Sequence, residues 1–549
     1  MSNFISTGIA GLDTILEGGF LRHNSILLKG APGTGKTSLG IQILLEAIEN
    51  GEAAIICSFE QFPQQLYRDS EAFGWNLQVL EAEDKLRILY IKPEDLVTPK
   101  GHANPPIISR IHEIAEELGV TRLLLDSVTH FNRVSNDPVA CRSLLMHFST
   151  VVKCMGITPI LTSELLQAHS REYSFEEYLV DEVVMLHNEL AAATSSLPQR
   201  TIEITKSRGH SHIPGRHPFV FSDSGIVVYP HVLPEPFEAE EMSDLELGVV
   251  SSGIKGIDNL MGGGYPESGA AMIAGMSGTF KSSLAGAFLA EGARNGQKGL
   301  LITFEETPQQ FVRNLKSRGV DLADAFQKGD VQIRHYVPKR NSLDEIFHDL
   351  VAQMRDNGVK RVVIDSIDDF ERSVDNVEAR KDYFGMFLAA LKRHGATSVF
   401  TQKIQRSSGS NPLADIRYVS MVDTVIYLGT VEIESRIHKA ISVLKCRSAS
   451  PDADLREIAC GPEGIQVGSK FHGLSGILEG VAHGQYKATV ENIFQPLYFI
   501  RDFANMGTGE AVNDEDRRKI VNDIASQLGN LEKALKDHFG FDPEEEKRH

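Results

Sequence analysis

The chain contains one sequence pattern twice, and this duplication limits the folds it can adopt. The opening STGIAGLDTILEGGF, which begins at residue 6, returns as SSGIKGIDNLMGGGY from residue 251. Later motifs repeat at a nearly constant distance: Lys281 follows Lys36 by 245 residues, and Lys445 follows Lys206 by 239. A repeat held over roughly two hundred residues indicates two copies of one domain. Further matched pairs are Glu60 with Glu305 and Asp126 with Asp365.

A chain of 549 residues is too long for one hydrophobic core and should divide into domains. We expect the two copies to occupy residues 1–234 and 247–475. The linker expected at 235–246 falls in a stretch rich in proline and acidic residues. Residues 476–549 lie beyond the repeat and should form a C-terminal helical extension.

Within each copy, short β-rich runs alternate with helical patterns. In the first copy SILLKG, AAIICSF and RLLLDS have the composition of buried strands, whereas TSLGIQILLEAIENG places its apolar residues on one helix face. Such alternation predicts an α/β domain with a mainly parallel sheet flanked by helices. Motifs at the strand ends would then lie where open α/β sheets bind ligands.

The sequence GAPGTGKT at residues 30–37 matches the phosphate-binding loop pattern G-x-x-x-x-G-K-[ST] in full. It follows a predicted strand and opens a predicted helix, as this loop requires. Its glycines let backbone N–H groups approach the phosphates, Lys36 reaches the β and γ oxygens, and Thr37 binds Mg²⁺. We therefore expect ATP and Mg²⁺ here rather than an ordinary glycine-rich turn. The nucleotide-binding candidates are Gly30, Gly33, Thr34, Gly35, Lys36, Thr37 and Ser38.

The second copy has GMSGTFKS at residues 275–282, with Phe280 where the pattern requires glycine. We expect this loop still to bind nucleotide if the φ angle of Phe280 is negative. The side chain can then point away from the phosphates, and Lys281 and Ser282 remain available. The alternative is a decayed site. The candidates in this loop are Gly275, Gly278, Thr279, Phe280, Lys281, Ser282 and Ser283.

Matched carboxylates follow two further strands in each copy. Asp126 and Asp365 end apolar runs, where a carboxylate can hold Mg²⁺ or its water, although a lone aspartate there more often caps a helix. Glu60 and Glu305 also follow buried runs; they could activate a water molecule or be ordinary surface side chains. The metal-binding candidates are Thr37, Asp126, Ser282, Asp365 and Glu305.

The TGI-x-GLD opening, the phosphate loop, the FE[EQ] and [LI]DS strand ends and a late K-x-R strand together resemble the KaiC family. This family comprises double-domain RecA-like ATPases whose founding members drive the bacterial circadian clock. The resemblance extends from about residue 4 to about residue 480. It implies tandem RecA-like P-loop domains and a homohexamer of two stacked rings, with ATP between neighbouring subunits.

By this resemblance Lys206 and Arg208, and likewise Lys445 and Arg447, would reach the γ-phosphate of a neighbouring subunit. Residues i and i+2 share one face of a strand, so each pair presents two cations together. An isolated pair of this kind would more often be a solvated edge. His212 follows the first pair closely and joins the nucleotide-binding candidates.

Each copy departs from the family pattern once. The family usually has two adjacent glutamates, of which the first activates the nucleophile and the second supports it. The second copy keeps Glu305 and Glu306, whereas Glu60 is followed by Gln61. The second copy instead carries Phe280 in its loop. We expect both copies to bind nucleotide and the first to dominate hydrolysis.

Clock members of the family phosphorylate an adjacent serine and threonine just upstream of a D-T strand. Alignment on Asp423 and Thr424 places Val419 and Ser420 at that pair, and Ala414 at a third acceptor position. Only Ser420 can accept phosphate. An ordered two-site cycle is therefore excluded at these positions, whereas single-site serine/threonine kinase activity remains open.

Composition and charge bear on three further questions: DNA binding, cellular location and a scaffold role. The formal net charge of −19, and the absence from the sequence of a basic loop with interleaved aromatics, disfavour a DNA-dependent ATPase. We see no signal peptide or long apolar run, and the five cysteines are scattered, so we expect a cytoplasmic protein without membrane contact. A regulatory scaffold whose ATP cycle switches protein partners remains open.

The final helical pattern has apolar residues at a/d spacing over about two heptads. It could pack on its own ring, pair with another subunit or a second hexamer to give a dodecamer, or bind a regulatory protein. The apolar residues are Val521, Ile524, Leu528, Leu531 and Leu535.

Overall fold

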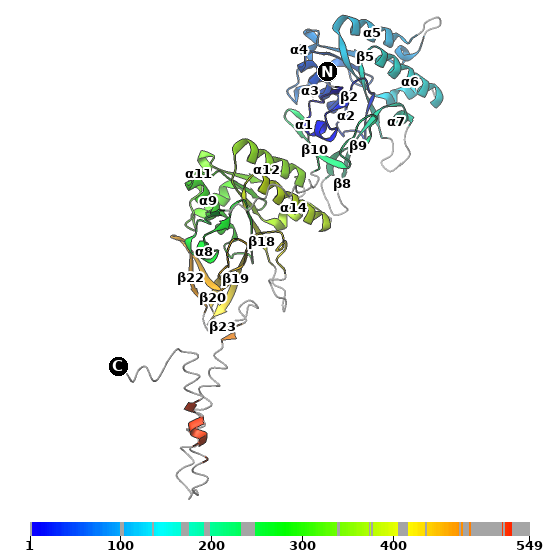
Figure 1. The fold of residues 1–549 in the computed structure, drawn as a ribbon. Helices are drawn as coiled ribbons and strands as arrows, with labels where there is room; N and C mark the ends of the chain where they lie inside the picture. Colours follow the sequence, from blue (N-terminus) through cyan, green and yellow to red (C-terminus); the bar gives the residue numbers. More distant parts are fainter. Residues whose placement is uncertain are drawn as a thin grey trace. The chain divides into compact units, whose positions relative to one another are not determined.

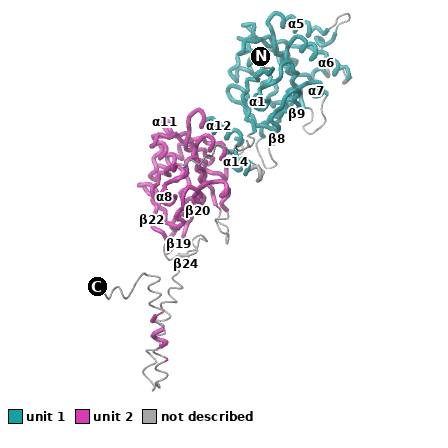
Figure 2. Tube along the Cα trace, viewed as in Figure 1, with its two compact units in different colours: residues 1–238, 336–352, 370–387 teal, residues 239–335, 353–369, 388–549 magenta. Residues whose placement is uncertain are grey.

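The chain is represented by a computed structural model that divides into two compact units (Figure 2). Unit 1 contains residues 1–238, 336–352 and 370–387, and unit 2 contains the remainder. The linker expected at 235–246 lies outside the residues that the structure describes. The described residues are 3–98, 104–133, 137–165, 175–190, 198–231, 248–337, 341–404 without 373, 375 and 376, 415–433, 436–471, 474–475, 483–484, 519, 522–526 and 528–529.

The first repeat forms a nine-stranded sheet in the order β11-β10-β9-β8-β3-β7-β6-β4-β5. Figure 1 shows this sheet with helices such as α5 and α6 beside it. The strands from β8 to β5 are parallel, and β9, β10 and β11 extend the sheet in antiparallel fashion. The strands of this repeat are β1 (Phe4–Ile5), β2 (Phe20–Leu21), β3 (Ile26–Gly30), β4 (Ala53–Ser58), β5 (Leu86–Tyr90), β6 (Val120–Asp126), β7 (Thr158–Glu164), β8 (Glu182–Leu190), β9 (Pro198–Lys206), β10 (Arg216–Ser222) and β11 (Gly225–Val228). The helices are α1 (Ala10–Ile15), α2 (Lys36–Glu49), α3 (Pro63–Glu71), α4 (Leu77–Ala82), η1 (Pro93–Leu96), α5 (Pro106–Leu118), η2 (Val128–Arg133), α6 (Pro138–Cys154) and α7 (Phe175–Leu179).

The second repeat forms a sheet of the same design, in the order β16-β15-β17-β18-β14-β19-β20-β21-β22. Its strands from β16 to β19 are parallel, and β20, β21 and β22 are antiparallel. The strands are β12 (Val249–Val250), β13 (Tyr265–Pro266), β14 (Ala270–Gly275), β15 (Gly299–Thr303), β16 (Val331–His335), β17 (Arg361–Asp365), β18 (Thr397–Lys403), β19 (Thr424–Ile433), β20 (Arg436–Cys446), β21 (Arg456–Gly461), β22 (Gly464–Lys470), β23 (Leu474–Ser475) and β24 (His483–Gly484). The helices are α8 (Lys255–Leu260), α9 (Lys281–Arg294), α10 (Pro308–Lys316), α11 (Ala323–Lys328), α12 (Leu343–Asn357), α13 (Ile367–Glu371) and α14 (Val377–Arg393).

The two sheets confirm the prediction of tandem RecA-like domains, each with a mainly parallel sheet flanked by helices. In β3, Ile26 and Leu28 enter the hydrophobic cluster on one face, and Leu27 enters the cluster on the other. Alternate side chains of a strand point to opposite faces, so helices must cover both faces of this sheet. This explains why the sequence of β3 is mainly apolar and does not alternate between apolar and polar residues.

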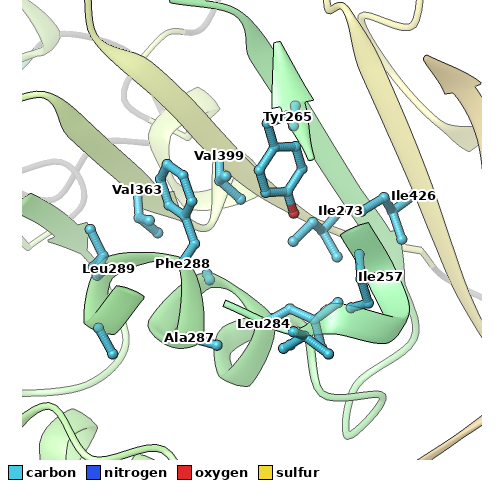
Figure 3. Packing of buried hydrophobic residues seen from close by; sticks show 14 of the residues in the cluster. Ile257, Tyr265, Ile273, Leu284, Ala287, Phe288, Leu289, Val363, Val399 and Ile426 are labelled. Carbon is cyan, nitrogen blue, oxygen red and sulfur yellow. The ribbon is translucent and has the colours of Figure 1, made fainter. Parts of the chain in front are cut away.

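Helix α9 is buried on all sides along residues 283–290, and its apolar side chains pack against the second sheet (Figure 3). Leu284 and Phe288 of this helix belong to the same buried cluster as Ile273 of β14 and Val363 of β17. The ring of Phe288 meets that of Tyr265 edge-on, with ring centroids 5.5 Å apart. This packing fixes the helix whose first two residues, Lys281 and Ser282, are the last two of the second phosphate loop.

The repeated opening motif is structural. Asp13 accepts hydrogen bonds from Thr7 N at 2.8 Å and Ser6 Oγ at 2.9 Å. Buried Arg122 donates to the carbonyl of Ser6 and to that of Ile43 in α2, at 2.9 and 2.7 Å. The opening is thereby held against the helix that follows the phosphate loop. Asp258 and Arg361 make the matching bonds in the second repeat.

No helix in the described part of the chain combines the length and apolar character needed to cross a bilayer. Within the C-terminal extension, Ile524 and Leu528 have helical backbone, and Leu528 is 45% exposed. The other apolar residues at a/d spacing, Val521, Leu531 and Leu535, lie outside the described residues.

Candidate nucleotide-binding sites

The candidates of each repeat gather at one edge of its sheet. The loop after β3, Asp126 at the end of β6 and Glu60 just after β4 all leave parallel strands in the same direction. The loop at 275–282, Asp365 after β17 and Glu305 after β15 repeat this arrangement. The carboxyl edge of a parallel sheet is where open α/β folds bind ligands.

The first phosphate loop has the backbone expected of it. Gly33 and Gly35 have φ angles of 75° and 103°, in the region that favours glycine. Thr34 Oγ1 donates to the carbonyl three residues earlier at 2.9 Å, which closes the turn. Lys36 Nζ donates to two carbonyls at the start of the loop, each at 3.0 Å. The lysine is thus held inside the loop, where a phosphate would lie.

The environment of Lys36 suits an anionic ligand. Burial lowers the pKa of this lysine, while the carboxylates of Glu164, Asp126 and Glu60 act in the opposite direction. An ammonium group that is partly withdrawn from water attracts phosphate more strongly than a solvated one. Lys281 is held in the same way, and burial lowers its pKa too.

The residues present also fit a magnesium ion. Thr37 Oγ1 donates to Asp126 Oδ2 at 2.8 Å, and the other carboxylate oxygen accepts from Thr162. Mg²⁺ prefers hard oxygen ligands and keeps several waters, so one hydroxyl and one carboxylate suffice beside phosphate. Ser282 and Asp365 occupy the matching positions. Among the described residues no group of three or more His, Cys, Asp or Glu side chains could hold a metal alone.

The second loop shows that the condition we placed on Phe280 is wrong. Its φ is +74° rather than negative, so Phe280 adopts the left-handed conformation that Gly35 adopts in the first loop. This conformation costs a bulky residue about 1–2 kcal/mol. The path of the loop is kept nonetheless, since Gly278 has φ of 77° and Lys281 Nζ donates to two loop carbonyls at 2.9 and 2.8 Å.

A phenylalanine ring lies beside both loops but comes from different elements. In the first repeat, a Cβ atom at Gly35 would lie only 2.6 Å from Cζ of Phe221 in β10. In the second repeat, Cys460 of β21 stands 239 residues after Phe221, the interval found for the late strands. Phe280 supplies the ring from the loop instead. In the first repeat the loop position is glycine and the strand position is phenylalanine. In the second repeat the loop position is phenylalanine and the strand position is the smaller cysteine.

A cation covers each of these rings. Lys439 Nζ lies 3.6 Å from the ring centroid of Phe280, and Arg200 Cζ lies 5.1 Å from that of Phe221. Lys439 and Arg200 are themselves 239 residues apart. Such contacts contribute about 0.5–2 kcal/mol, enough to offset much of the backbone cost at Phe280. The second loop is therefore altered in a compensated way, which does not favour simple decay.

We expect this exchange to be tolerated only as a pair. Cys460→Phe alone should destabilise the second repeat by about 1–3 kcal/mol, because two rings then compete for one space. Adding Phe280→Gly should restore most of the loss, since it recreates the combination of the first repeat. Thermal unfolding of the single and double variants measures the coupling. Additive effects of the two substitutions would contradict the exchange.

A second exchange, between an amide and a carboxylate, involves Gln61 and Glu306, the residues that follow Glu60 and Glu305. Gln61 Nε2 donates to Asp69 Oδ2 at 3.2 Å, whereas in the second repeat Asn314 Nδ2 donates to Glu306 Oε2 at 3.2 Å. Each contact joins positions eight residues apart and pairs one amide with one carboxylate. The first repeat therefore keeps a carboxylate in this contact although its second glutamate is missing.

The K-x-R residues make the same contacts in both repeats. Lys206 Nζ donates to two carbonyls just before β8, both at 2.6 Å, and Lys445 Nζ donates to two just before β19, both at 2.7 Å. Arg208 and Arg447 approach the aspartates that precede those strands, at 3.7 and 3.1 Å. Their side chains remain 58% and 52% exposed. The lysines hold the backbone of their own chain, and the arginines are the more accessible cations.

The remaining candidates are placed as follows. Ser38 lies half-buried in the first turn of α2, whereas the hydroxyl of buried Ser283 accepts from Arg318 at 2.9 Å. His212 lies half-buried between β9 and β10. Ser420 is exposed in the turn before β19, and its carbonyl accepts from Arg447 at 3.0 Å. Ala414 lies outside the described residues.

Three residues that no sequence motif marks contact a candidate residue or its neighbour: His130, Asp69 and Arg318. Their partners lie 8 to 70 positions away, and no local motif marks such contacts. The sequence does contain one indication of these residues. When the two repeats are aligned by their constant offsets, each of the three positions has a different residue type in the other repeat. Arg318, for example, stands 245 residues after Phe73.

Comparison with known proteins agrees with this geometry. The family model described as "ATPase: KaiC" matches residues 5–232 and again residues 250–471. The circadian clock oscillator protein KaiC of Acaryochloris marina is 30% identical over 486 residues, which cover 87% of this chain and 90% of the relative. That of Synechococcus elongatus is 30% identical over 480 residues, 86% of this chain and 91% of the relative. The circadian clock protein KaiC3 of Synechocystis is 28% identical over 499 residues, 89% of this chain and 96% of the relative.

The two matched segments coincide with the two repeats, and each contains one complete nine-stranded sheet and one phosphate loop. The curated relatives are matched along nearly their whole length rather than over a single domain. The chain therefore belongs to the KaiC family, and it carries two KaiC ATPase domains.

Proposed function

We propose that this chain is an ATP-hydrolysing regulatory protein that binds ATP with Mg²⁺ in both repeats and hydrolyses it chiefly in the first. The observation that carries the proposal is the grouping of Lys36, the Thr37–Asp126 pair and Glu60 at one sheet edge. Phosphoryl transfer to water needs a phosphate cradle, a site for the metal and a group that orients the water. The first repeat supplies all three.

Each group has a defined task in this chemistry. Backbone N–H groups of the loop and the ammonium of Lys36 would hold the β and γ phosphates in place. Thr37 and Asp126 would hold Mg²⁺, which neutralises charge on the phosphate oxygens when bound. Glu60 would accept a proton from the attacking water and so direct it at the γ-phosphorus.

The second repeat would bind nucleotide but turn it over more slowly. Lys281, Glu305 and Glu306 are present, and the loop follows the same path. The ring of Phe280 nevertheless replaces the hydrogen of a glycine immediately before the lysine, next to the groups that position the γ-phosphate. Misplacement by about 1 Å can cost a hundredfold in rate.

We further propose a homohexamer of two rings, in which Arg208 and Arg447 reach the nucleotide of a neighbouring subunit. Support comes from the accessibility of these arginines and from family membership. The domains proposed are 1–234 and 247–475, joined at 235–246. The extension at 476–549 would pair two hexamers into a dodecamer or receive a regulatory protein partner.

Removal of Mg²⁺ should reduce ATP hydrolysis by the full-length chain to the background rate. The metal offsets charge that the loop alone cannot balance. Hydrolysis should return when Mg²⁺ is added after chelation with EDTA. Asp126→Asn should raise the Mg²⁺ concentration needed for half-maximal rate, whereas Asp365→Asn should have a smaller effect. Undiminished hydrolysis in excess EDTA would contradict the proposed site.

Autophosphorylation is a second candidate activity, favoured by the exposure of Ser420 just before β19. We expect it to be weak, because Arg447 holds the carbonyl of Ser420 and Phe280 disturbs the loop that aims the γ-phosphate. Incubation with labelled ATP followed by peptide mass mapping should find phosphate on only a minor fraction of chains. Stoichiometric phosphate on Ser420 that disappears in Glu305→Gln would show that the kinase activity is strong.

A further inference from the structure

A histidine that the proposed mechanism does not use touches the candidate base of the first repeat. His130 Nε2 lies 2.5 Å from Glu60 Oε1. The histidine is buried, with 6% of its surface exposed, whereas the side chain of Glu60 is 53% exposed. The contact thus joins a fixed ring to a side chain that would otherwise move in solvent.

The ring of His130 is held on two sides. It stacks on Phe59, with ring centroids 5.6 Å apart and planes inclined by 23°. Its backbone belongs to η2, the short helix that follows Asp126, and its N–H donates to the carbonyl of Ser127 at 3.2 Å. The histidine is therefore tied to the strand end that carries the magnesium candidate, and Phe59 directly precedes Glu60.

We infer that His130 is a positioning residue that fixes Glu60 for attack by water in the first repeat. A carboxylate can only accept hydrogen bonds, so Nε2 must carry the proton that lies between them. Oε1 of Glu60 then accepts this bond, and the orientation it fixes would let Oε2 accept a proton from water. The inference rests on the proposed ATPase function and adds a residue to its site.

The second repeat has no equivalent of this contact at the matched position. Asp369 stands 239 residues after His130 and accepts from Ser366 Oγ at 2.9 Å. An ionised aspartate at this position has no N–H group and cannot supply the hydrogen bond that His130 supplies in the first repeat. His130 is therefore present only in the repeat that we expect to hydrolyse ATP faster.

Two substitutions separate the hydrogen bond from the packing. His130→Phe keeps an aromatic ring to stack on Phe59 but removes the donor. His130→Gln keeps an N–H donor but removes the ring. Both are made in the full-length chain carrying Lys281→Ala, so that hydrolysis reports the first repeat. The measurements are kcat and KM for ATP hydrolysis and the thermal unfolding midpoint.

We expect His130→Phe to lower kcat by about ten- to a hundredfold with KM changed less than about twofold, and His130→Gln to retain most of kcat. Unchanged or increased kcat in His130→Phe would overturn the inference. Equal losses in both variants, with a raised KM or a lowered unfolding midpoint, would also overturn it by showing a structural role. If the Lys281→Ala chain itself hydrolyses no ATP, or its hydrolysis survives Glu60→Gln, the proposed function fails instead.

Discussion

The Lys36→Ala chain should hydrolyse ATP about a hundredfold more slowly than the unaltered chain. This substitution removes the buried ammonium group, which the first loop holds at the phosphate position through two of its carbonyls. Lys281→Ala should leave most of the hydrolysis in place, because the second loop carries Phe280. Steady-state phosphate release from both variants measures the difference.

The control for folding is nucleotide binding by the unchanged repeat. Lys36→Ala should still bind a fluorescent ATP analogue through the second repeat, and Lys281→Ala through the first. The double variant Lys36→Ala/Lys281→Ala should bind none. If Lys281→Ala abolishes turnover while Lys36→Ala keeps it, the dominant site has been assigned to the wrong repeat.

Arg208→Ala should reduce hydrolysis in the first repeat about a thousandfold if the arginine acts on a neighbouring subunit's nucleotide. The guanidinium would stabilise charge on the γ-phosphate during transfer, and its loss removes interaction energy that exists only in the transition state. Binding of ATP should change little. Arg447→Ala is the matched control in the second repeat and should reduce total hydrolysis much less.

Mixing two inactive variants tests the placement of Arg208 across a subunit boundary. A Lys36→Ala chain lacks the loop lysine but supplies Arg208, and an Arg208→Ala chain supplies Lys36. Random assembly of equal amounts should restore activity at about a quarter of the interfaces. Absence of any recovery after confirmed subunit exchange would place Arg208 at the nucleotide of its own chain.

Much of the fold follows from the sequence because its determinants are local. The loop at 30–37 needs glycines at fixed spacing, and the buried strand before it needs an unbroken apolar run, so both are visible in the residue order. The duplication then predicts the second sheet from the first. The catalytic roles of Glu60, Asp126 and the K-x-R residues remain predictions, although the structure brings Glu60 and Asp126 to one edge.

The sequence could not give the contacts between distant residues. The positive φ of Phe280 is not visible in the local sequence, and the cation that covers its ring, Lys439, lies far along the chain. The contact between His130 and Glu60 likewise joins positions 70 apart. Such pairs are set by tertiary packing, and neither partner carries a local pattern that identifies the other.

Native mass spectrometry of the full-length chain with Mg²⁺ and a slowly hydrolysed ATP analogue tests the central claim most directly. The claim is that each chain holds two nucleotides and that neighbouring chains complete the sites. The account predicts a hexamer carrying two nucleotides per chain, falling to one per chain in either Lys36→Ala or Lys281→Ala. A single chain that remains unassembled at saturating nucleotide, or an assembly with one nucleotide per chain lost entirely in Lys36→Ala, would contradict it.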